Sequence, residues 1–326
     1  MSRRPVVVVL GEHAQDRPEH LEPIADRVEL RFTDEHGLPD AVQGAEVLFL
    51  WHFFSTAVQD VWAQCTGLRW IHVAAAGVDK LVFPALAASD VVVTNARGVF
   101  DRPIAEYVLG AVLAHAKQTH LSHDLQRRHV WRHRETRSAK GAHAMVVGTG
   151  GIGRETARLL RAVGMRVTGA GRTARTDDPD FGTVVPSHAL VEHLGDVDYL
   201  VNAAPLTPAT RGLVDAAVLT ALPAHAHLVN VGRGESVVTD DLVAALRAGS
   251  LDGVSLDVVD PEPLPEDSPL WDLPGVVITP HMSGDVVGWR DTLARQFVAN
   301  AERWLDGRPL RNVVDTRLGY VPGGGR

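Results

Sequence analysis

The chain has 326 residues, a formal net charge of −8 and a single cysteine, Cys65. At ~100–200 residues per domain this length predicts about two domains, and one cysteine excludes an intramolecular disulfide. The acidic balance argues against nucleic acid or an anionic membrane as the main partner. We find no targeting segment and no run of ~20 apolar residues, so we expect a cytoplasmic protein without a membrane span.

Short apolar runs rich in valine recur along the chain and predict strands. Most of them do not alternate with polar residues, which is typical of strands buried on both faces of a parallel sheet. The runs are Val6–Leu10, Val47–Leu50, Trp70–Val73, Val91–Thr94, Ala144–Val147, Arg166–Thr168, Tyr199–Val201, His227–Val231, Gly253–Leu256 and Val276–Ile278. Amphipathic stretches such as Arg154–Val163, Ser187–His193 and Asp240–Arg247 predict helices between them. This alternation favours a doubly wound α/β fold.

Two longer helical stretches stand apart from this alternation. Ile104–Gln118 is apolar and rich in alanine, and it precedes the polar segment Thr119–Arg137. Asp285–Leu305 carries apolar residues at helical spacing. Each stretch is either an ordinary packed helix or a place where a second domain joins the first.

The sharpest local signal is the glycine pattern Gly148-Thr149-Gly150-Gly151-Ile152-Gly153. It follows an apolar strand and opens a helix, which is the context that a dinucleotide-binding turn requires. Gly148 allows the tight turn, Gly150 lets the backbone approach a pyrophosphate, and Gly153 permits close packing of helix and sheet. The helix N-terminus then offers N–H groups to the phosphates. The alternative is a glycine turn that binds no nucleotide.

The end of the next strand bears on the form of the cofactor. In NAD-binding chains an acidic residue is expected about 20 residues further on, where it bonds the ribose 2′-hydroxyl. Here the strand Met165–Ala170 is followed by Arg172, Thr173 and Arg175, and the first carboxylate is Asp177. Arginine matches a phosphate in charge and geometry, so we favour NADP over NAD. In the alternative, Arg172 is a solvated loop residue and both cofactors are used.

Reactive side chains follow three later strands, where ligands of such sheets bind. Arg233 lies between two glycines, and His281 follows a proline. An arginine that binds a carboxylate and a histidine that exchanges a proton near neutral pH suit the reduction of an anionic carbonyl compound. A carboxylate paired with the histidine would orient it, and Asp257, Asp260 and Glu262 compete for this role.

These motifs together resemble the D-isomer-specific 2-hydroxyacid dehydrogenase family, which includes glyoxylate/hydroxypyruvate reductases, over nearly the whole chain. The resemblance rests on Ala75-Ala-Gly-Val-Asp79, Thr94-Asn-Ala-Arg-Gly98, Ala105-Glu106, the glycine pattern, Asn230-Val-Gly-Arg-Gly234, Asp257 through Pro263, and Pro280-His281. It implies two doubly wound parallel-sheet domains, a Rossmann cofactor domain (99–287) inserted in a flavodoxin-like substrate domain (1–98 plus 288–326), with the active site in the cleft between them.

The resemblance also implies roles for single residues. The family's catalytic arginine, carboxylate and histidine fall on Arg233, Glu262 and His281. The backbone N–H groups of Ala76 and Gly77 are expected to hold the substrate carboxylate, together with Arg233 and His281. The residues expected to line the cofactor are Thr149, Ile152, Pro205, Thr210, Val231 and Asp257, the last facing the nicotinamide.

Aromatic and histidine residues outside these motifs leave alternatives open. Trp51 and Trp289 are candidates for an apolar wall that selects the substrate side chain, or else for packing and subunit contacts.

Three pairs of histidines raise the question of a metal site, but neither a cysteine pair nor a His-Glu-x-x-His motif accompanies them, so we expect no metal. The pairs are His120 and His123, His129 and His133, and His225 and His227.

The expected reaction is the NADPH-dependent reduction of a small 2-oxoacid, such as glyoxylate or hydroxypyruvate, to the (R)-2-hydroxyacid. The resemblance implies a homodimer packed largely through residues 104–137. The alternatives are an NAD-dependent dehydrogenase of a bulkier 2-oxoacid, a formate or phosphite dehydrogenase, and a nucleotide-sensing relative without catalysis. Formate dehydrogenases replace the paired carboxylate with an amide, so Glu262 argues against them.

Overall fold

The computed structural model describes residues 3–322, which divide into two units. Unit 1 combines the residues up to Phe100 with those from Val286 onward, and unit 2 runs from Asp101 to Asp285. The boundaries predicted from the sequence are 98/99 and 287/288. Each unit has its own sheet and its own hydrophobic core.

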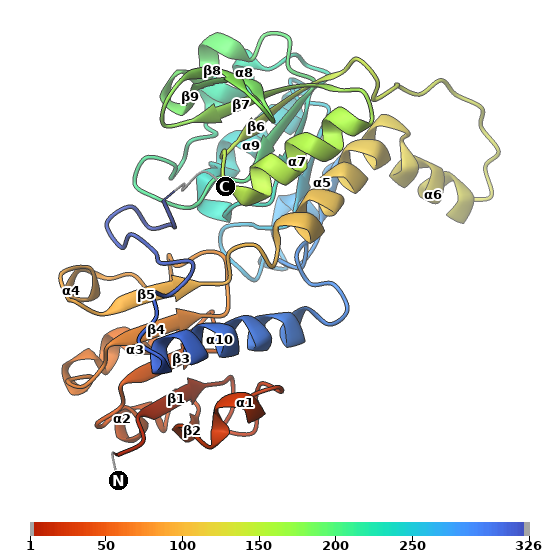
Figure 1. Cartoon of the computed structure of the whole chain (residues 1–326). Coiled ribbons are helices and arrows are strands. Elements are labelled where there is room, and N and C mark those ends of the chain that lie inside the picture. The colour runs from red at the N-terminus through yellow and green to blue at the C-terminus, as the bar shows by residue number, and fades with distance from the viewer. Residues whose placement is uncertain (1–2, 323–326) are drawn as a thin grey trace. The chain divides into compact units, whose positions relative to one another are not determined.

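The sheet of unit 1 has five parallel strands in the order β2-β1-β3-β4-β5 (Figure 1). This order is that of a flavodoxin-like sheet, as predicted. The strands are β1 (Val6–Leu10), β2 (Glu29–Thr33), β3 (Val47–Leu50), β4 (Trp70–Val73) and β5 (Val92–Asn95). The apolar pattern misses β2, because this edge strand is partly exposed and carries Glu29 and Arg31.

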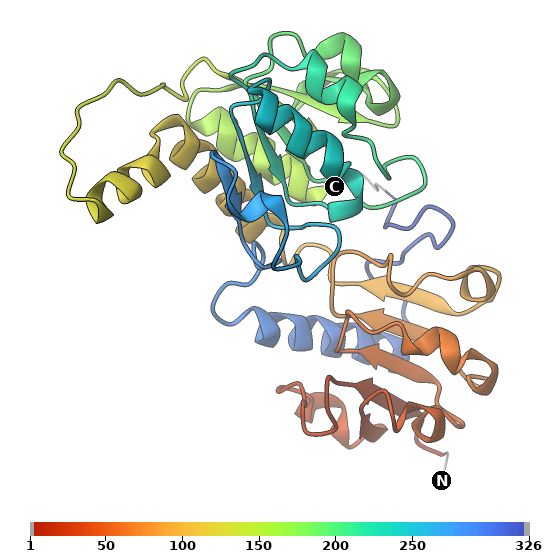
Figure 2. The same ribbon diagram turned by 180° about the vertical axis from the view of Figure 1, so that it is seen from behind.

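The C-terminal helix α10 (Trp289–Leu305) lies along the sheet of unit 1 (Figures 1 and 2). Its Phe297 is fully buried and stacks on Phe49 of β3 with ring centroids 4.0 Å apart, and on Trp70 of β4 at 5.4 Å. Unit 1 therefore needs both ends of the chain. The shorter helices of this unit are α1 (Glu22–Ala25), α2 (Leu38–Ala41), α3 (Ala57–Asp60), α4 (Pro84–Ala87) and the 3₁₀ helix η1 (Trp62–Gln64).

Unit 2 has an eight-stranded sheet in the order β13-β12-β11-β10-β6-β7-β9-β8, parallel except for β8. The strands that follow β6 in the chain first lie on one side of it, from β7 to β9, and then on its other side, from β10 to β13, which is the Rossmann arrangement. The predicted fold class is therefore confirmed for both units. The strands are β6 (His143–Val147), β7 (Arg166–Gly171), β8 (Arg175–Asp178), β9 (Gly182–Pro186), β10 (Tyr199–Asn202), β11 (His227–Asn230), β12 (Gly253–Leu256) and β13 (Val276–Ile278).

The helices of unit 2 cover this sheet, and α5 packs against α7 (Figure 1). The helices are α5 (Asp101–Ala116), α6 (Thr119–Arg127), α7 (Gly151–Ala162), α8 (Ala216–Ala221), α9 (Thr239–Ala248) and the 3₁₀ helices η2 (Ser187–His193), η3 (Gly234–Ser236) and η4 (Pro269–Trp271). Both views show α6 and the segment after it projecting from the rest of unit 2 (Figures 1 and 2). No helix within residues 3–322 is both long and apolar enough to cross a bilayer.

The structure refines the predicted helices. The helix predicted at Ser187–His193 is a 3₁₀ helix with a kink at Ala189, whose φ is −113°. The polar segment Thr119–Arg137, for which no helix was predicted, begins with α6, which ends at Arg127. The helix α10 begins at Trp289 rather than at Asp285, since Gly288 precedes it with φ +82°.

Candidate active site

The residues predicted to act in unit 2 lie in the loops after its strands. Because parallel strands end at the same edge of a sheet, these loops leave unit 2 side by side, where ligands of doubly wound folds bind. The loops follow β6, β7, β10, β11, β12 and β13.

The glycine turn after β6 contains two glycines that the protein's own packing requires. Gly148 has φ +99°, and a Cβ there would lie 2.7 Å from the backbone of Ala203. A Cβ on Gly153 would lie 1.8 Å from the carbonyl oxygen of Gly148. Gly150 differs, because no described atom lies within 4 Å of the place its Cβ would take. Open space beside the backbone at the N-terminus of the 12-residue helix α7 fits the pyrophosphate of a dinucleotide.

The absence of a side chain at Gly151 makes room for the carboxyl group of Asp101. A Cβ on this residue would lie 2.1 Å from a carboxyl oxygen of Asp101, the first residue of α5. The carboxyl group of Asp101 therefore lies against the first residue of α7. The sequence contained no signal for this contact.

The residues after β7 lie where the adenosine ribose of a dinucleotide is expected. Arg172 and Thr173 are exposed, and Arg175 begins the short antiparallel strand β8. Arg175 Nε donates to Asp178 Oδ2 at 2.7 Å, so this guanidinium is tethered at one nitrogen. A tethered arginine loses less conformational freedom when it binds an anion.

Asp178 is the centre of a network of charged hydrogen bonds. Its side chain is 3% exposed and accepts from Arg175 and, at 3.0 Å through both oxygens, from Arg154 of α7. Burial by itself raises the pKa of Asp178, but the bonds from Arg154, Arg175 and the amides of Asp180 and Phe181 outweigh it and hold the pKa well below its usual range. The sequence analysis missed Asp178, because β8 lacks an apolar pattern.

Arg233 lies in the loop after β11 between two glycines at which a Cβ would collide with the backbone of a neighbouring loop. A Cβ on Gly232 would lie 2.8 Å from the carbonyl oxygen of Ala204, and one on Gly234 would lie 1.9 Å from that of Val259. The neighbouring loops thus approach Arg233 from both sides. Its guanidinium Nη1 donates to the carbonyl oxygen of Gly232 at 2.8 Å.

Two buried asparagines at the ends of β10 and β11 shape these loops. Asn202 Nδ2 donates to Asn230 Oδ1 at 2.9 Å, and the two residues are partners in the parallel register. Asn230 also accepts from the amide of Gly232 and donates to the carbonyl oxygen of Arg233. Asn202 was missed from sequence, although both strands end in the same Leu-Val-Asn triplet.

His281 and Glu262 form a hydrogen-bonded pair. His281 Nδ1 lies 2.9 Å from Glu262 Oε2, and the amide of Val259 donates to Glu262 Oε1 at 3.1 Å. Burial raises the pKa of Glu262, but the bond from His281, its charge, the Val259 amide and the charge of Arg233 together lower the pKa below its ordinary value. An ionised Glu262 accepts the proton of Nδ1, which assigns proton exchange with a ligand to Nε2. Of the three competing carboxylates, Glu262 is the one that pairs with the ring of His281.

Asp257 is 2% exposed, and both of its carboxylate oxygens bond to the loop of His281. Oδ1 accepts from Thr279 Oγ1 at 2.6 Å and from the amide of Met282 at 3.0 Å, and Oδ2 accepts from the amide of Ser283 at 2.9 Å. The backbone oxygen of Asp257 accepts from the amide of His281 at 2.8 Å. That Asp257 also faces a nicotinamide stays a prediction.

A profile of the NAD-binding domain of D-isomer-specific 2-hydroxyacid dehydrogenases matches residues 109–283, more than half of the chain. The chain belongs to the D-isomer-specific 2-hydroxyacid dehydrogenase family. It is therefore an oxidoreductase that uses NAD(P) and acts on small 2-hydroxyacids or 2-oxoacids.

Individual relatives of this dehydrogenase carry more specific names. A glyoxylate/hydroxypyruvate reductase A of Serratia proteamaculans is 31% identical over 215 residues, 66% of this chain and 68% of that protein. A hydroxyphenylpyruvate reductase of Plectranthus scutellarioides is 32% identical over 244 residues, 73% of this chain and 75% of that protein. The crystal structure of an NADPH-dependent glyoxylate/hydroxypyruvate reductase of Sinorhizobium meliloti, in complex with NADP and sulfate, is 29% identical, with a TM-score of 0.82 over 98% of this chain and 100% of that chain.

Other residues predicted to line the cofactor of the dehydrogenase also lie on this edge of unit 2. Thr210 Oγ1 donates to the carbonyl oxygen of Pro205 at 2.7 Å and thereby closes the turn after β10. Val231 is buried directly after β11, while Thr149 and Ile152 are half-buried in the glycine turn and the first turn of α7. Their contact with a cofactor stays a prediction.

The substrate-binding residues predicted in unit 1 are at the corresponding edge of its own sheet. Ala76 and Gly77 follow β4, and the carbonyl oxygen of Ala76 accepts from Asn95 Nδ2 at 2.6 Å. Trp51 is 4% exposed, donates from its indole nitrogen to Asp16 and lies under the guanidinium of Arg290 at 4.5 Å. Trp289, half-buried at the start of α10, contacts the rings of Phe53 and Phe100. Their roles toward a substrate stay predictions.

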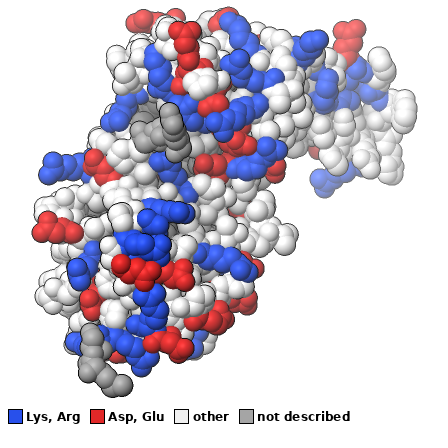
Figure 3. All heavy atoms as spheres, in the orientation of Figure 1, with Lys and Arg blue, Asp and Glu red and all other residues white. Residues whose placement is uncertain are grey.

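Positive and negative side chains are interspersed over the face of the dehydrogenase shown in Figure 3.

A cavity of about 530 Å³ in unit 1 is lined by residues that include Trp62, Arg69, Asp90 and Trp304. It lies beside the amino ends of β4 and β5, opposite the edge at which ligands of doubly wound sheets bind.

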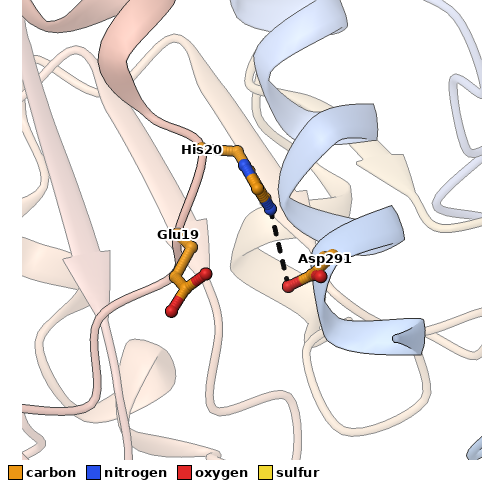
Figure 4. A group of neighbouring side chains, drawn as sticks. All are labelled: Glu19, His20 and Asp291. Carbon is orange, nitrogen blue, oxygen red and sulfur yellow. Dashed lines mark ion pairs between the residues drawn. The ribbon is translucent and has the colours of Figure 1, made fainter. Parts of the chain in front are cut away.

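One group of three residues within the described part of the chain could in principle hold a metal ion, and it contains none of the three histidine pairs considered from the sequence. His20 Nε2 lies 3.6 Å from Asp291 Oδ1, with Glu19 beside them (Figure 4). Arg295 Nη2 lies 3.2 Å from the same ring nitrogen. A guanidinium at the ligating atom opposes a cation, so we assign this group to surface ion pairing.

The pKa of Asp178 leads to a prediction about stability. Because the folded pKa is depressed, the stabilisation is present above the unfolded pKa of about 3.9 and is lost as the pH falls toward the folded value. Asp178→Asn should lower the free energy of unfolding at pH 7 by about 3 kcal/mol, and the difference from the wild type should shrink below about pH 4. Urea unfolding at pH 7, 5 and 3.5 measures this.

The exposed Asp196, which pairs with Arg166 in the same unit, provides a matched control. Asp196→Asn should cost less than about 1 kcal/mol. A difference between Asp178→Asn and the wild type that stays constant across this pH range would contradict the prediction.

Proposed function

We propose that this dehydrogenase reduces a small 2-oxoacid of the glyoxylate or hydroxypyruvate type to the (R)-2-hydroxyacid, with NADPH as the hydride donor. The observation that carries the proposal is the placement of Arg233 and the His281–Glu262 pair on the same sheet edge as the glycine turn. The names of the Serratia and Sinorhizobium relatives support the substrate class.

Arg233 supplies the positive charge for the anionic substrate. A guanidinium can bind a carboxylate through two parallel hydrogen bonds and can polarise an adjacent carbonyl group. The bond from Nη1 to Gly232 and the close loops on both sides restrict its motion before a ligand arrives. Arg233 therefore positions the substrate and stabilises the negative charge that develops on the carbonyl oxygen.

His281 exchanges the proton. In the reducing direction, Nε2 donates a proton to the carbonyl oxygen while Glu262, ionised and bonded to Nδ1, stabilises the cationic ring and fixes its orientation. In the reverse direction, neutral Nε2 accepts the proton of the hydroxyl group. The same pair thus serves both directions of the reaction.

The glycine turn and the N-terminus of α7 would hold the pyrophosphate of the cofactor, and the loops after β10 and β11 would line it. When bound, the reduced nicotinamide supplies the hydride to the carbonyl carbon. Hydride and proton together convert the 2-oxoacid into the 2-hydroxyacid.

The preference for NADPH rests on Arg172, Thr173 and Arg175. Two arginines and a hydroxyl group suit a ribose 2′-phosphate, and β7 lacks the terminal carboxylate that would repel it. The tether from Arg175 to Asp178 leaves its two terminal nitrogens outside any hydrogen bond of the described residues.

A second candidate is the reduction of a bulkier 2-oxoacid. It is favoured by the hydroxyphenylpyruvate reductase among the relatives. Rates with glyoxylate, hydroxypyruvate, pyruvate and an aryl pyruvate, each with NADPH and with NADH, distinguish the two candidates.

We also propose that the dehydrogenase is a homodimer packed largely through residues 104–137, which include the projecting segment 119–137. Trp131 in this segment is 101% exposed and Val130 is 45% exposed. Large apolar side chains presented in this way are typical of interfaces, where tryptophan often carries much of the binding energy.

The role of His281 can be tested directly. His281→Ala should lower kcat by about 100- to 10 000-fold, because general acid catalysis is lost, while the dissociation constant of NADPH stays near the wild-type value. His225→Ala provides the control, since His225 forms a similar pair with Asp198 at 2.8 Å on the amino edge of the same sheet. Wild-type kcat in His281→Ala would refute the assignment.

The cofactor preference can be tested with Arg172→Gln combined with Arg175→Gln. The KM for NADPH should rise about 10- to 100-fold through the loss of charged hydrogen bonds, and the KM for NADH should change much less. The control is Arg166→Gln, at the other end of β7. Equal increases of both KM values would remove the argument for NADPH.

The homodimer can be tested by sedimentation equilibrium. Trp131→Ala should raise the dissociation constant of the dimer by about 30-fold or more, whereas Val287→Ala, which changes a fully exposed apolar residue of unit 1, should leave it unchanged. A monomeric wild type at micromolar concentration would contradict the proposal.

A further inference from the structure

A chain of hydrogen bonds runs from α5 to the loop that carries His281. Thr279 Oγ1 donates to Asp257 Oδ1 at 2.6 Å and lies 2.8 Å from the hydroxyl oxygen of Tyr107. A hydroxyl group has one hydrogen, and Thr279 gives it to a carboxylate that can only accept. Tyr107 must therefore donate to Thr279, so the chain runs from Tyr107 through Thr279 to Asp257.

Asp257 holds three consecutive amides of the same loop. Its backbone oxygen accepts from His281, and its two carboxylate oxygens accept from Met282 and Ser283. A rotation of the Asp257 carboxylate would break two of these bonds. The bond from Thr279 opposes that rotation, since it occupies the same oxygen as the amide of Met282.

The backbone of His281 needs such support. Its φ of +53° lies in the left-handed region, which is unfavourable for a residue with a Cβ. A strained conformation of this kind persists when the surrounding contacts over-determine it. The bonds to Asp257 are those contacts, and they set the direction in which the ring leaves the backbone toward Glu262.

We propose that Tyr107 and Thr279 are positioning residues of the reaction, which hold Asp257 so that its bonds to residues 281–283 keep the imidazole of His281 in the orientation for proton transfer. The inference rests on the proposed function, because His281 is the proton donor there. It adds two residues that touch neither the substrate nor the reacting atoms.

The surroundings of Tyr107 keep it a donor. The side chain is half-buried, and burial raises the pKa of its hydroxyl group; the charge of Asp257 acts in the same direction, against the lowering effect of the bond to Thr279. The pKa of Tyr107 is therefore raised, and the hydroxyl group retains its hydrogen at neutral pH.

Tyr107→Phe and Thr279→Val remove the chain with little change in volume. We expect each to lower kcat about tenfold or more through misplacement of His281, with the KM for the 2-oxoacid unchanged. Thr279→Ser keeps the hydroxyl group and should therefore have the kcat of the wild type. The double variant Tyr107→Phe with Thr279→Val should lose no more than Thr279→Val, because both act through the same oxygen of Asp257.

Tyr199→Phe is the matched control. The hydroxyl group of Tyr199 is buried at the amino edge of the same sheet, 3.2 Å from His115 Nδ1. This variant should keep wild-type kcat. Wild-type kcat in both Tyr107→Phe and Thr279→Val, or an equal loss in Tyr199→Phe, would overturn the inference.

A second measurement keeps the test independent of turnover. The imidazole signals of His281 can be assigned in NMR spectra by comparison with His281→Ala, and their chemical shifts at a fixed pH should change in Thr279→Val but not in Tyr199→Phe, because the ring moves relative to Glu262. If the wild type turned over no 2-oxoacid, the proposed function would fail while this measurement still decided the positioning role. Unchanged imidazole shifts in Thr279→Val would overturn it.

Discussion

The candidate site of unit 2 depends on the fact that parallel strands end at one edge of a sheet. Neighbouring strands lie about 4.8 Å apart, so the loops after β6, β10, β11 and β12 leave the sheet almost in contact. Side chains at the points of closest approach would collide with the next loop. This is why Gly148, Gly232 and Gly234 face the backbone of a neighbouring loop at less than 3 Å from the position of a Cβ.

The same crowding restricts the functional side chains. Arg233 is bonded to Gly232, Arg175 to Asp178, and His281 to Glu262. A side chain that is already held loses less conformational freedom when a ligand binds or a proton moves. The net charge of −8 is therefore compatible with anionic ligands, because the arginines that would meet them are concentrated and held at this edge.

Most of the buried strands could be predicted from sequence, because strands covered on both faces carry continuous apolar runs. Of the edge strands, β5 and β13 could be predicted, but β2 and β8 could not. Glu29 and Arg31 interrupt the pattern of β2, and β8 reads Arg-Thr-Asp-Asp, since an edge strand needs few apolar residues. The glycine turn could also be predicted from the sequence, but the structure shows that its glycines are needed for different reasons. Gly148 and Gly153 allow close packing, Gly151 makes room for Asp101, and Gly150 borders open space.

The sequence by itself determined the fold class, the family and the residue types at the strand ends, because apolar runs and glycine spacings are local properties of the chain. The tertiary structure decided which of these residues meet. It paired Glu262, rather than Asp257 or Asp260, with the ring of His281, and it brought Tyr107 to Thr279 across 172 residues. Local spacing does not determine such contacts, since they arise when separate strands and helices pack around one sheet.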